Sequence, residues 1–385
     1  PSGPMGSPKE NSMKKKVALV ATAAAAALLV GLTAPTANAA LKPSTRANVG
    51  DECVGAGAVA KGRGVNGTDL TCMKVSTGSY AGTLRWWYAD VKPFGSLEWV
   101  ASSAIGGGYG TTAIAMGDAM KKEGLLKDYT VTYKTNAPLG LGYFYDQKGR
   151  NDILLITGFA MPGGLATNGS KLTITTAKAV AGVMREAEAF VVPTSSKYKS
   201  IQDLLTDLKA NPKAVAIGGG NYGGVDHVTV ATLAATVGVK ATDLNYIPYS
   251  GGGSLTPDVI GGRVAVGIAG TSEFSSYVAA GKMRVLAVTS PKPLKVIKGK
   301  TLVQQGVDLT FGNWRGILAP SDLSAADYLN TVKIFDILHS SPSWKDTLVA
   351  KSWIDEYRSG DAFQTWLKKE NTDIINVLTD FKLVK

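Results

Sequence analysis

Residues 247–290 read IPYSGGGSLTPDVIGGRVAVGIAGTSEFSSYVAAGKMRVLAVTS, and this stretch decides the fold. Three short apolar segments, at 244–249, 264–268 and 284–288, are predicted to be strands. Glycine-rich turns and helix-length segments separate them. Strands that alternate with helices indicate an α/β fold in which the strands run mostly parallel and right-handed crossovers join them.

The same alternation begins at Gly95. Apolar runs predict further strands at 97–102, 129–133, 152–156, 190–192 and 214–217, with helices near Ile114, at 201–210 and at 228–237. The C-terminal segment is mainly helical, because apolar side chains recur there at helical spacing, as in Ile374, Val377, Leu378 and Phe381. About 290 residues exceed one such sheet of ordinary size, so we predict two lobes.

Several predicted strand-to-helix turns are rich in glycine: 106–110, 162–164, 218–224 and 251–253. Ligands of open α/β sheets bind at the carboxyl ends of the strands, where a helix N-terminus offers unpaired N–H groups and a partial positive charge. Glycine lets the backbone approach a ligand closely or adopt positive φ. A single glycine turn needs no ligand to explain it, but turns at several equivalent positions favour a shared anion site.

The second of these turns also fits the dinucleotide fingerprint G-x-G-x-x-G, as Gly218-x-Gly220-x-x-Gly223. That fingerprint requires an acidic residue at the end of the next strand. Asp243 has the right spacing but precedes its strand. We therefore predict no nicotinamide cofactor, and no cofactor of another kind.

The N-terminal segment indicates export. Lys14, Lys15 and Lys16 precede an apolar run at 17–30, and Ala37-Asn38-Ala39 forms an A-x-A cleavage site. The apolar run is shorter than the roughly 18 to 20 residues that span a bilayer. We predict an extracytoplasmic chain, periplasmic or secreted, after cleavage near Ala39. The full sequence has a formal net charge of +11, and its scattered basic residues suit anion attraction better than nucleic-acid binding.

Cys53 and Cys72 are the only cysteines, and in an oxidising compartment such a pair predicts a disulfide. They lie in a glycine-rich segment of short alternating runs, which we interpret as a small disulfide-closed β element. The chain has only two histidines, and neither is near the cysteines, so we predict no metal site.

Several motifs resemble the substrate-binding receptors of tripartite tricarboxylate transporters, of the Bordetella uptake gene type. The family typically shows P-Y-x-G-G-G, G-G-x-V-D, A-G-K-L-R-x-L-A-V-T-S and W-x-G-x-x-A-P. Here the corresponding residues are 248–253, 261–265, 280–290 and 314–320. In the family, a proline precedes the triple glycine that corresponds to 106–108, and Ile105 replaces it here. Ala265 replaces the aspartate of G-G-x-V-D. The loop at 218–224 is longer than in the family by about one residue and contains Tyr222. Tyr109 and Tyr222 suit a larger or aromatic carboxylate, or they cover the lobe interface.

The resemblance implies a periplasmic-binding-protein-like Venus-flytrap: two α/β lobes with a hinge, preceded by the small disulfide-closed β element. We predict a leader and signal peptide at 1–39 and the β module at 40–92. Lobe 1 would comprise 93–185 and 291–385, and lobe 2 would comprise 186–290. The crossings between them are expected near Phe190–Val192 and Leu286–Val288.

The resemblance also implies a function: capture of a di-, tri- or aromatic carboxylate by a monomer that delivers it to the membrane subunits of a secondary transporter. The turns at 106–111 and 220–224 contain no Lys or Arg, so backbone N–H groups and hydroxyls would hold the anion. The predicted ligand-binding residues are Gly106, Gly107, Gly108, Tyr109, Thr111, Asn221, Tyr222, Gly223, His227, Tyr249, Gly251 and Thr271.

Two alternatives belong to other functional classes. A surface receptor that senses a ligand would use the same fold with a different partner. A secreted hydrolase would need a Ser-His-Asp triad, for which Asp226 and His227 are candidates. Adjacent helical residues point about 100° apart, and the chain lacks a G-x-S-x-G elbow, so we predict a protein without enzymatic activity.

Overall fold

The computed structural model describes residues 47–384. The predicted leader, signal peptide and cleavage site lie outside these residues. Within them no helix is long and apolar enough to cross a membrane. Cys53 and Cys72 form the predicted disulfide.

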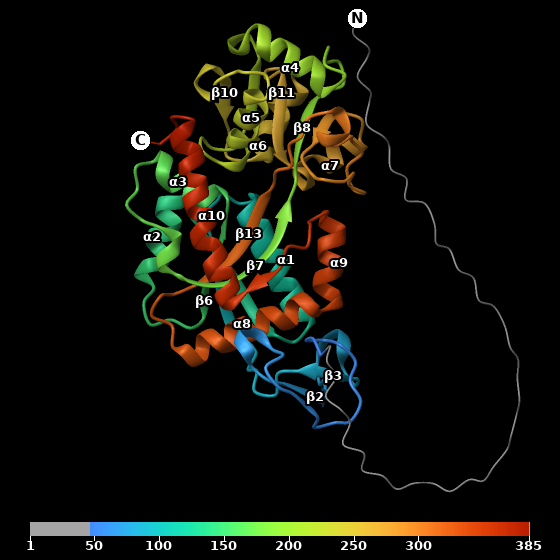
Figure 1. Ribbon diagram of the computed structural model, residues 1–385, viewed down its shortest axis with the longest axis vertical. Helices are drawn as coiled ribbons and strands as arrows, with labels where there is room; N and C mark the ends of the chain where they lie inside the picture. The colour runs from blue at the N-terminus through green and yellow to red at the C-terminus, as the bar shows by residue number, and fades with distance from the viewer. Residues whose placement is uncertain (1–46, 385) are drawn as a thin grey trace, which may run out of the picture. The chain divides into compact units, whose positions relative to one another are not determined.

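Three sheets organise the described chain (Figure 1). The N-terminal sheet has the order β1(Val59–Ala60)-β2(Leu70–Lys74)-β3(Leu84–Trp87). The sheet of lobe 1 has the order β14(Arg358–Ser359)-β7(Lys178–Glu186)-β13(Asn313–Ala319)-β6(Ile153–Gly158)-β4(Phe94–Ala101)-β5(Leu126–Tyr133). The sheet of lobe 2 has the order β10(Asn245–Pro248)-β9(Ala216–Gly219)-β11(Val266–Gly270)-β8(Glu188–Pro193)-β12(Met283–Val288).

Helices follow the strands in both lobes. Lobe 1 contains α1(Gly108–Lys122), α2(Ala137–Asp146), α3(Ala160–Thr167), α8(Ala325–Ser340), α9(Pro342–Lys351) and α10(Gly360–Asp380). Lobe 2 contains α4(Ile201–Ala210), α5(Val225–Ala235), α6(Gly252–Ile260) and α7(Thr271–Ala279). The two-lobed Venus-flytrap fold is confirmed, whereas the residue limits of the domains stay predictions.

Both faces of the lobe 2 sheet are covered, which explains why β8 is apolar over Ala189–Val192. Successive side chains of a strand point to opposite faces. Phe190 and Val192 pack with the helices α4 and α5, and Ala189 and Val191 pack with α6 and α7. A strand buried on both faces shows no polar alternation.

The expectation of mostly parallel strands is wrong. β4 pairs in parallel with β5 and β6, and β9 pairs in parallel with β10 and β11. β13 is antiparallel to β6 and β7, and β8 is antiparallel to β11 and β12. The antiparallel pairs involve β7, β8, β12 and β13, which flank the two segments where the chain passes between the lobes. Because the chain enters lobe 2 through one segment and returns through the other, these strands run in both directions.

The passages lie next to the segments predicted for them. Phe190–Val192 and Leu286–Val288 belong to β8 and β12, which pair within lobe 2. The chain changes lobes at Ala187, between β7 and β8, and again after Val288, before β13 (Figure 1).

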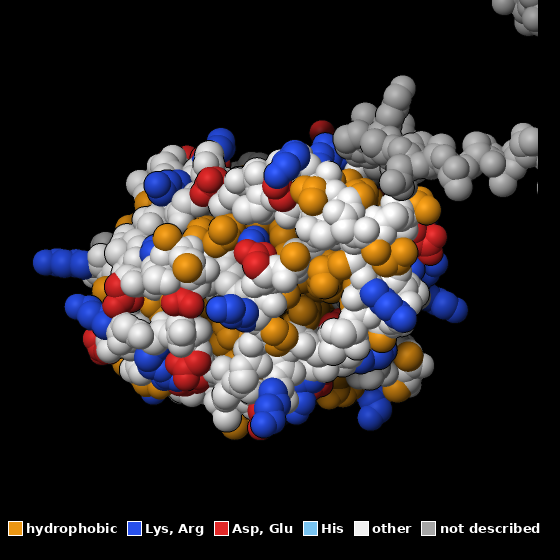
Figure 2. Space-filling view, turned by 90° about the horizontal axis from the view of Figure 1, so that it is seen from below, with side chains coloured by type: hydrophobic (Ala, Val, Ile, Leu, Met, Phe, Trp, Pro, Cys, Tyr) orange, Lys and Arg blue, Asp and Glu red, His pale blue; other side chains and the backbone are white. Residues whose placement is uncertain are grey.

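The N-terminal module packs on lobe 1. The Tyr88 hydroxyl donates to Asp336 at 2.6 Å, and Lys333 forms an ion pair with Asp90 at 2.7 Å. Glu123, at the end of α1, accepts hydrogen bonds from the N–H and hydroxyl of Ser79. On the face shown in Figure 2, basic and acidic side chains are interspersed with apolar ones.

Candidate functional site

The first glycine-rich turn leads from β4 into α1. Gly106 has a φ of +84°, which favours glycine, and Gly107 is the N-cap of α1 without a side-chain cap. The Thr111 N–H already donates to the carbonyl of Gly107. The N–H groups of Gly108, Tyr109 and Gly110 precede it in the first turn, where a helix offers no acceptor. This end of α1 can therefore accept an anion.

Arg315 lies against the same helix end. It projects from β13, where its neighbours across the sheet are Gly158 and Met184. A Cβ at position 108 would collide with its Nη2 atom, so Gly108 gives the guanidinium room beside the first turn of α1. The guanidinium also lies 4.9 Å from the ring centre of Tyr109. A fixed positive charge and a helix N-terminus thus point to one place.

The Arg315 side chain has few partners although it is only 5% exposed. Its Nη1 atom donates weakly to the Trp314 carbonyl at 3.4 Å, and its Nε atom has no hydrogen-bond partner among the described residues. No carboxylate of those residues lies within 4.0 Å of it. A buried charge normally pairs or is solvated, so this guanidinium indicates a place for an anion.

Three backbone N–H groups in the turns of lobe 2 bond to the chain's own carboxylates. Asp226 accepts the Gly220 N–H at 2.6 Å, and Glu273 accepts the Gly252 N–H at 2.7 Å. Glu186 accepts the Ser272 N–H at 2.9 Å and the Ser272 hydroxyl. Gly252 and Ser272 lie in the first turns of α6 and α7, and Gly220 precedes α5. These N–H groups are not available to a ligand anion without displacing a side chain.

Glu188 completes what we call the acid cluster: Glu186, Glu188, Asp226 and Glu273. It is fully buried, and neither of its carboxylate oxygens has a hydrogen-bond donor among the described residues. Burial, reinforced by the Asp226 charge, raises the pKa of Glu188 well above its ordinary value. Two ionised carboxylates can only accept, so Glu188 and Asp226 can hydrogen-bond to each other only when one carries a proton. Burial without a donor favours the neutral, protonated form of Glu188 over its carboxylate.

Burial also raises the pKa of Asp226. Burial and the Glu186 charge together raise the pKa of Glu273 to about 7. The Arg315 guanidinium opposes both rises. Its charge therefore acts on these two carboxyl groups although it forms no ion pair with them. At the junction, lobe 1 presents the Arg315 cation, and lobe 2 presents the acids Glu188, Asp226 and Glu273.

His227 and Tyr222 shape the second glycine-rich turn. His227 Nδ1 accepts the Gly223 N–H at 3.1 Å, and its ring stacks on Tyr246 with centres 4.3 Å apart. Burial lowers the pKa of His227 to about 4, so the ring is neutral. The Tyr222 hydroxyl donates to the Tyr246 carbonyl. Asp226 and His227 thus bond to separate backbone donors, which is not the geometry of a triad.

This turn meets lobe 1 at α3. The Thr167 hydroxyl donates to the Tyr222 carbonyl at 3.3 Å, and a Cβ on Gly163 would collide with the Gly223 carbonyl oxygen. The glycines at 163 and 223 therefore permit close approach of the two lobes. Among the predicted ligand-binding residues, Gly106–Tyr109 and Thr111 lie in lobe 1, and Asn221–Gly223 lie where the lobes meet.

The other predicted residues lie within lobe 2. Tyr249 donates its hydroxyl to Asp258 at 2.6 Å, and Gly251 is the N-cap of α6 with a φ of +135°. Thr271 is buried, and its hydroxyl has no partner among the described residues. Ligand contact by all twelve predicted residues, in either lobe, stays a prediction.

Sequence reasoning missed Arg315 and the acid cluster. Arg315 lies within the motif at 314–320 and is the one charge within the buried strand Asn313–Ala319. Glu186 and Glu188 likewise interrupt the apolar run of β7 and β8. Charges isolated in apolar strands are the pattern that could have found them.

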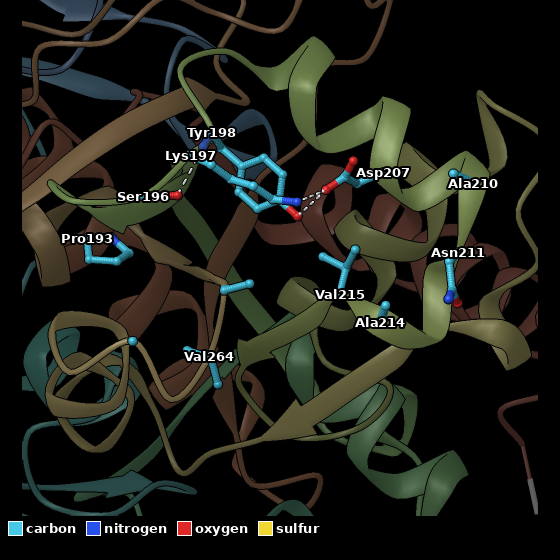
Figure 3. A pocket seen from close by; sticks show the side chains of 12 residues that line it. Pro193, Ser196, Lys197, Tyr198, Asp207, Ala210, Asn211, Ala214, Val215 and Val264 are labelled. Atoms are coloured by element: carbon cyan, nitrogen blue, oxygen red, sulfur yellow. Dashed lines mark hydrogen bonds and ion pairs between the residues drawn. The ribbon is translucent and has the colours of Figure 1, made fainter.

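A surface cavity of about 450 Å³ lies elsewhere in lobe 2 (Figure 3). Val215 and Val264 line it at the amino ends of β9 and β11, opposite the carboxyl ends where ligands bind. Its one acidic side chain, Asp207, is already bonded to Lys197 and to the Tyr198 hydroxyl. The charges of this cavity are therefore satisfied within the chain.

Comparison with known proteins gives one family. The model of the tripartite tricarboxylate transporter family receptor matches residues 170–344. A protein encoded in the gbd 5′ region of Cupriavidus necator is 26% identical over 159 residues, 41% of this chain and 47% of that protein. A protein from the clcB-clcD intergenic region of Pseudomonas knackmussii is 32% identical over 101 residues, 26% of this chain and 58% of that protein. The chain spans about half the length of these curated relatives.

Solved structures share the fold. The periplasmic binding protein BugD is 18% identical with a TM-score of 0.66, covering 76% of this chain and 100% of that one. MatC from Rhodopseudomonas palustris with bound malate is 14% identical with a TM-score of 0.63, covering 74% and 100%. An R. palustris protein with adipate is 18% identical with a TM-score of 0.65, covering 76% and 99%. Residues 170–344 are therefore similar to the tripartite tricarboxylate transporter family receptor, and the described chain shares the fold of these solved structures.

Proposed function

We propose that this protein is an extracytoplasmic solute-binding protein. It captures a small organic carboxylate between its lobes and delivers it to the membrane subunits of a tripartite tricarboxylate-type transporter. The malate and adipate in two proteins of the same fold support a carboxylate ligand. The predicted signal peptide and the described chain's two-lobed fold support a receptor outside the cytoplasm, acting as a monomer.

The observation that carries this proposal is the Arg315 guanidinium beside the uncapped N-terminus of α1. A carboxylate bound there would accept hydrogen bonds from Arg315 and from the first-turn N–H groups of α1. Hinge closure would then enclose the ligand between the lobes. Lobe 1, rather than both lobes equally, would hold the anion.

Calorimetry against a panel of di-, tri- and aromatic carboxylates tests the proposal. A hydrogen bond to a charged group contributes about 1.5 to 3 kcal/mol, so Arg315→Ala should weaken carboxylate binding about 10- to 100-fold. Lys282→Ala, an exposed residue at the end of lobe 2's α7–β12 connection, is the control and should bind as the unmodified protein does. Equal affinity of Arg315→Ala and the unmodified protein for the tightest carboxylate would contradict the proposal.

A further inference from the structure

The edge of lobe 2 contains a long stretch of chain without acidic residues. From residue 274 to residue 307 there are six basic side chains and no Asp or Glu, against a formal net charge of +11 for the full sequence. Four of the six lie in residues 290–301, which follow β12 and which we call the basic loop: Lys292, Lys295, Lys298 and Lys300. All four lysines are exposed.

The chain does not neutralise the charges of the basic loop. Among the residues that the structure describes, five other lysines form ion pairs with aspartates: Lys61, Lys121, Lys197, Lys333 and Lys369. The four lysines of the basic loop form none with any described carboxylate. Glu273, the acid that precedes the stretch, already accepts the Gly252 N–H. The basic loop therefore presents four uncompensated positive charges to its surroundings.

The backbone of the basic loop is held firmly on lobe 2. The Val288 N–H donates to the Lys300 carbonyl at 3.0 Å, and the Leu302 N–H donates to the Val288 carbonyl at 3.0 Å. The end of the loop thus pairs with the edge strand β12. Ile297, in the middle of the loop, is 1% exposed and packs in the core of lobe 2. The lysines consequently extend from a fixed part of the fold rather than from a loose tail.

The surface of the basic loop offers charge without an apolar anchor. Between residues 261 and 302 no large apolar side chain is exposed, and Leu294 and Ile297 pack into the lobe. A stable protein–protein interface normally has an apolar core. The loop also lacks arginine, the residue whose planar fork binds one phosphate through two hydrogen bonds. Separate lysine charges suit an extended anionic surface better than a folded partner or a single phosphate.

We propose that the basic loop docks lobe 2 on a bilayer that contains anionic phospholipids. This inference goes beyond the proposed function and does not depend on which ligand the lobes capture. Each lysine near such a surface strengthens binding about five-fold, and the attraction falls off within a Debye length. The contact would be reversible, would concentrate the protein beside the membrane and would leave lobe 1 free to move during hinge closure.

Co-sedimentation with lipid vesicles tests this inference. The protein is used without residues 1–39, because the predicted leader is basic and apolar and would itself bind lipid. We expect binding to vesicles of phosphatidylglycerol and phosphatidylcholine to be about 100-fold tighter, or more, than binding to vesicles of phosphatidylcholine alone. Binding should be lost at an ionic strength of about 1 M, where the Debye length falls to about 3 Å.

Two matched variants locate the contact. Replacing all four lysines of the basic loop, as Lys292→Gln, Lys295→Gln, Lys298→Gln and Lys300→Gln together, should weaken binding to the anionic vesicles about 100-fold or more. The control removes the same number of charges from exposed lysines of lobe 1 that form no ion pair: Lys127→Gln, Lys148→Gln, Lys171→Gln and Lys345→Gln. The control should bind nearly as the unmodified protein does. Thermal unfolding checks that both variants fold.

Three outcomes would overturn the inference. The first is that the unmodified protein ignores anionic vesicles at low salt. The second is an equal loss of binding in the two variants, because net charge rather than the basic loop would then be responsible. The third is binding to polyglutamate but not to vesicles, which would assign the loop to an acidic protein segment instead. None of these outcomes bears on carboxylate binding or on Arg315→Ala, so the proposed function is tested separately.

Discussion

The glycine-rich turns of the two lobes share a backbone design but differ in what fills them. In lobe 1, the end of α1 is uncapped and lies beside the Arg315 guanidinium. In lobe 2, the N–H groups of Gly220, Gly252 and Ser272 bond to the chain's own carboxylates, whereas α5 begins without a side-chain cap, as α1 does. Glycine determines the geometry of a turn, whereas charged side chains from distant strands determine which ligand group the turn accepts.

The largest expected effect comes from making lobe 1 resemble lobe 2. Gly108→Asp would place a carboxylate at the end of α1 beside Arg315, where the ligand carboxylate is proposed to bind. We expect ligand binding to fall by about 100-fold or more, because the intramolecular anion competes and repels. Calorimetry measures the loss, with thermal unfolding as the check that the variant folds.

Gly253→Asp is the matched control for this change. It lies in the first turn of α6, it is exposed, and a Cβ there would meet no atom within 4 Å. A similar loss of binding in both variants would mean that the loss in Gly108→Asp reflects added charge anywhere near the site.

A smaller effect is expected from removing one negative charge from the acid cluster. In Glu273→Gln the amide oxygen can still accept the Gly252 N–H, but one negative charge is removed. Malate or adipate, which bring a second carboxylate to lobe 2, should bind several-fold tighter, by about 1 kcal/mol. Tighter binding of monocarboxylates by the same factor would instead indicate a nonspecific effect of net charge, and competition calorimetry separates the two.

The smallest expected effect concerns the stability of the ligand-free protein. Burial raises the pKa of Glu273 from 4.5 to about 7, so the folded state binds more protons than the unfolded state between these values. The contribution of Glu273 to stability is therefore greatest below about pH 4.5 and is lost as pH rises to about 7. Because solvent screening reduces the effect at a partly exposed group, we expect Glu273 to change the free energy of unfolding by about 1 to 2 kcal/mol over this pH range.

Denaturant unfolding of the unmodified protein and of Glu273→Gln at pH 5 and pH 7.5 measures this contribution. His227, whose pKa burial lowers to about 4, acts in the opposite direction. Its effect cancels in the difference between the two proteins. A difference in the free energy of unfolding that does not change with pH would contradict a partly protonated Glu273.

Much of the fold could be predicted from the sequence, because its signals are local. The helix at 201–210 is predicted with its observed bounds, since Leu204, Leu205 and Leu208 line one face and Asn211-Pro212 ends it. The disulfide follows from two cysteines in a short segment. β7 and the antiparallel pairings were not predicted, because they depend on how the chain passes between the lobes.

The site was predicted only in part, for a related reason. The turn at Gly106–Gly108 is visible in the sequence as a glycine cluster, but Arg315 reaches it from more than 200 residues away. The pairing of Asp226, Glu273 and Glu186 with backbone N–H groups likewise depends on the folded arrangement of α5, α6, α7 and β7. Local patterns therefore predict where a ligand can bind, and the tertiary fold sets the charge that it must carry.

The most direct test of the central claim is a crystal structure with the tightest ligand of the calorimetric panel. The claim predicts that the ligand carboxylate lies about 3 Å from the Arg315 guanidinium and from the first-turn N–H groups of α1. Asp226 and Glu273 would keep their bonds to Gly220 and Gly252. A carboxylate bound to the Gly220–Gly224 turn, with Asp226 displaced and Arg315 without contact, would contradict the claim.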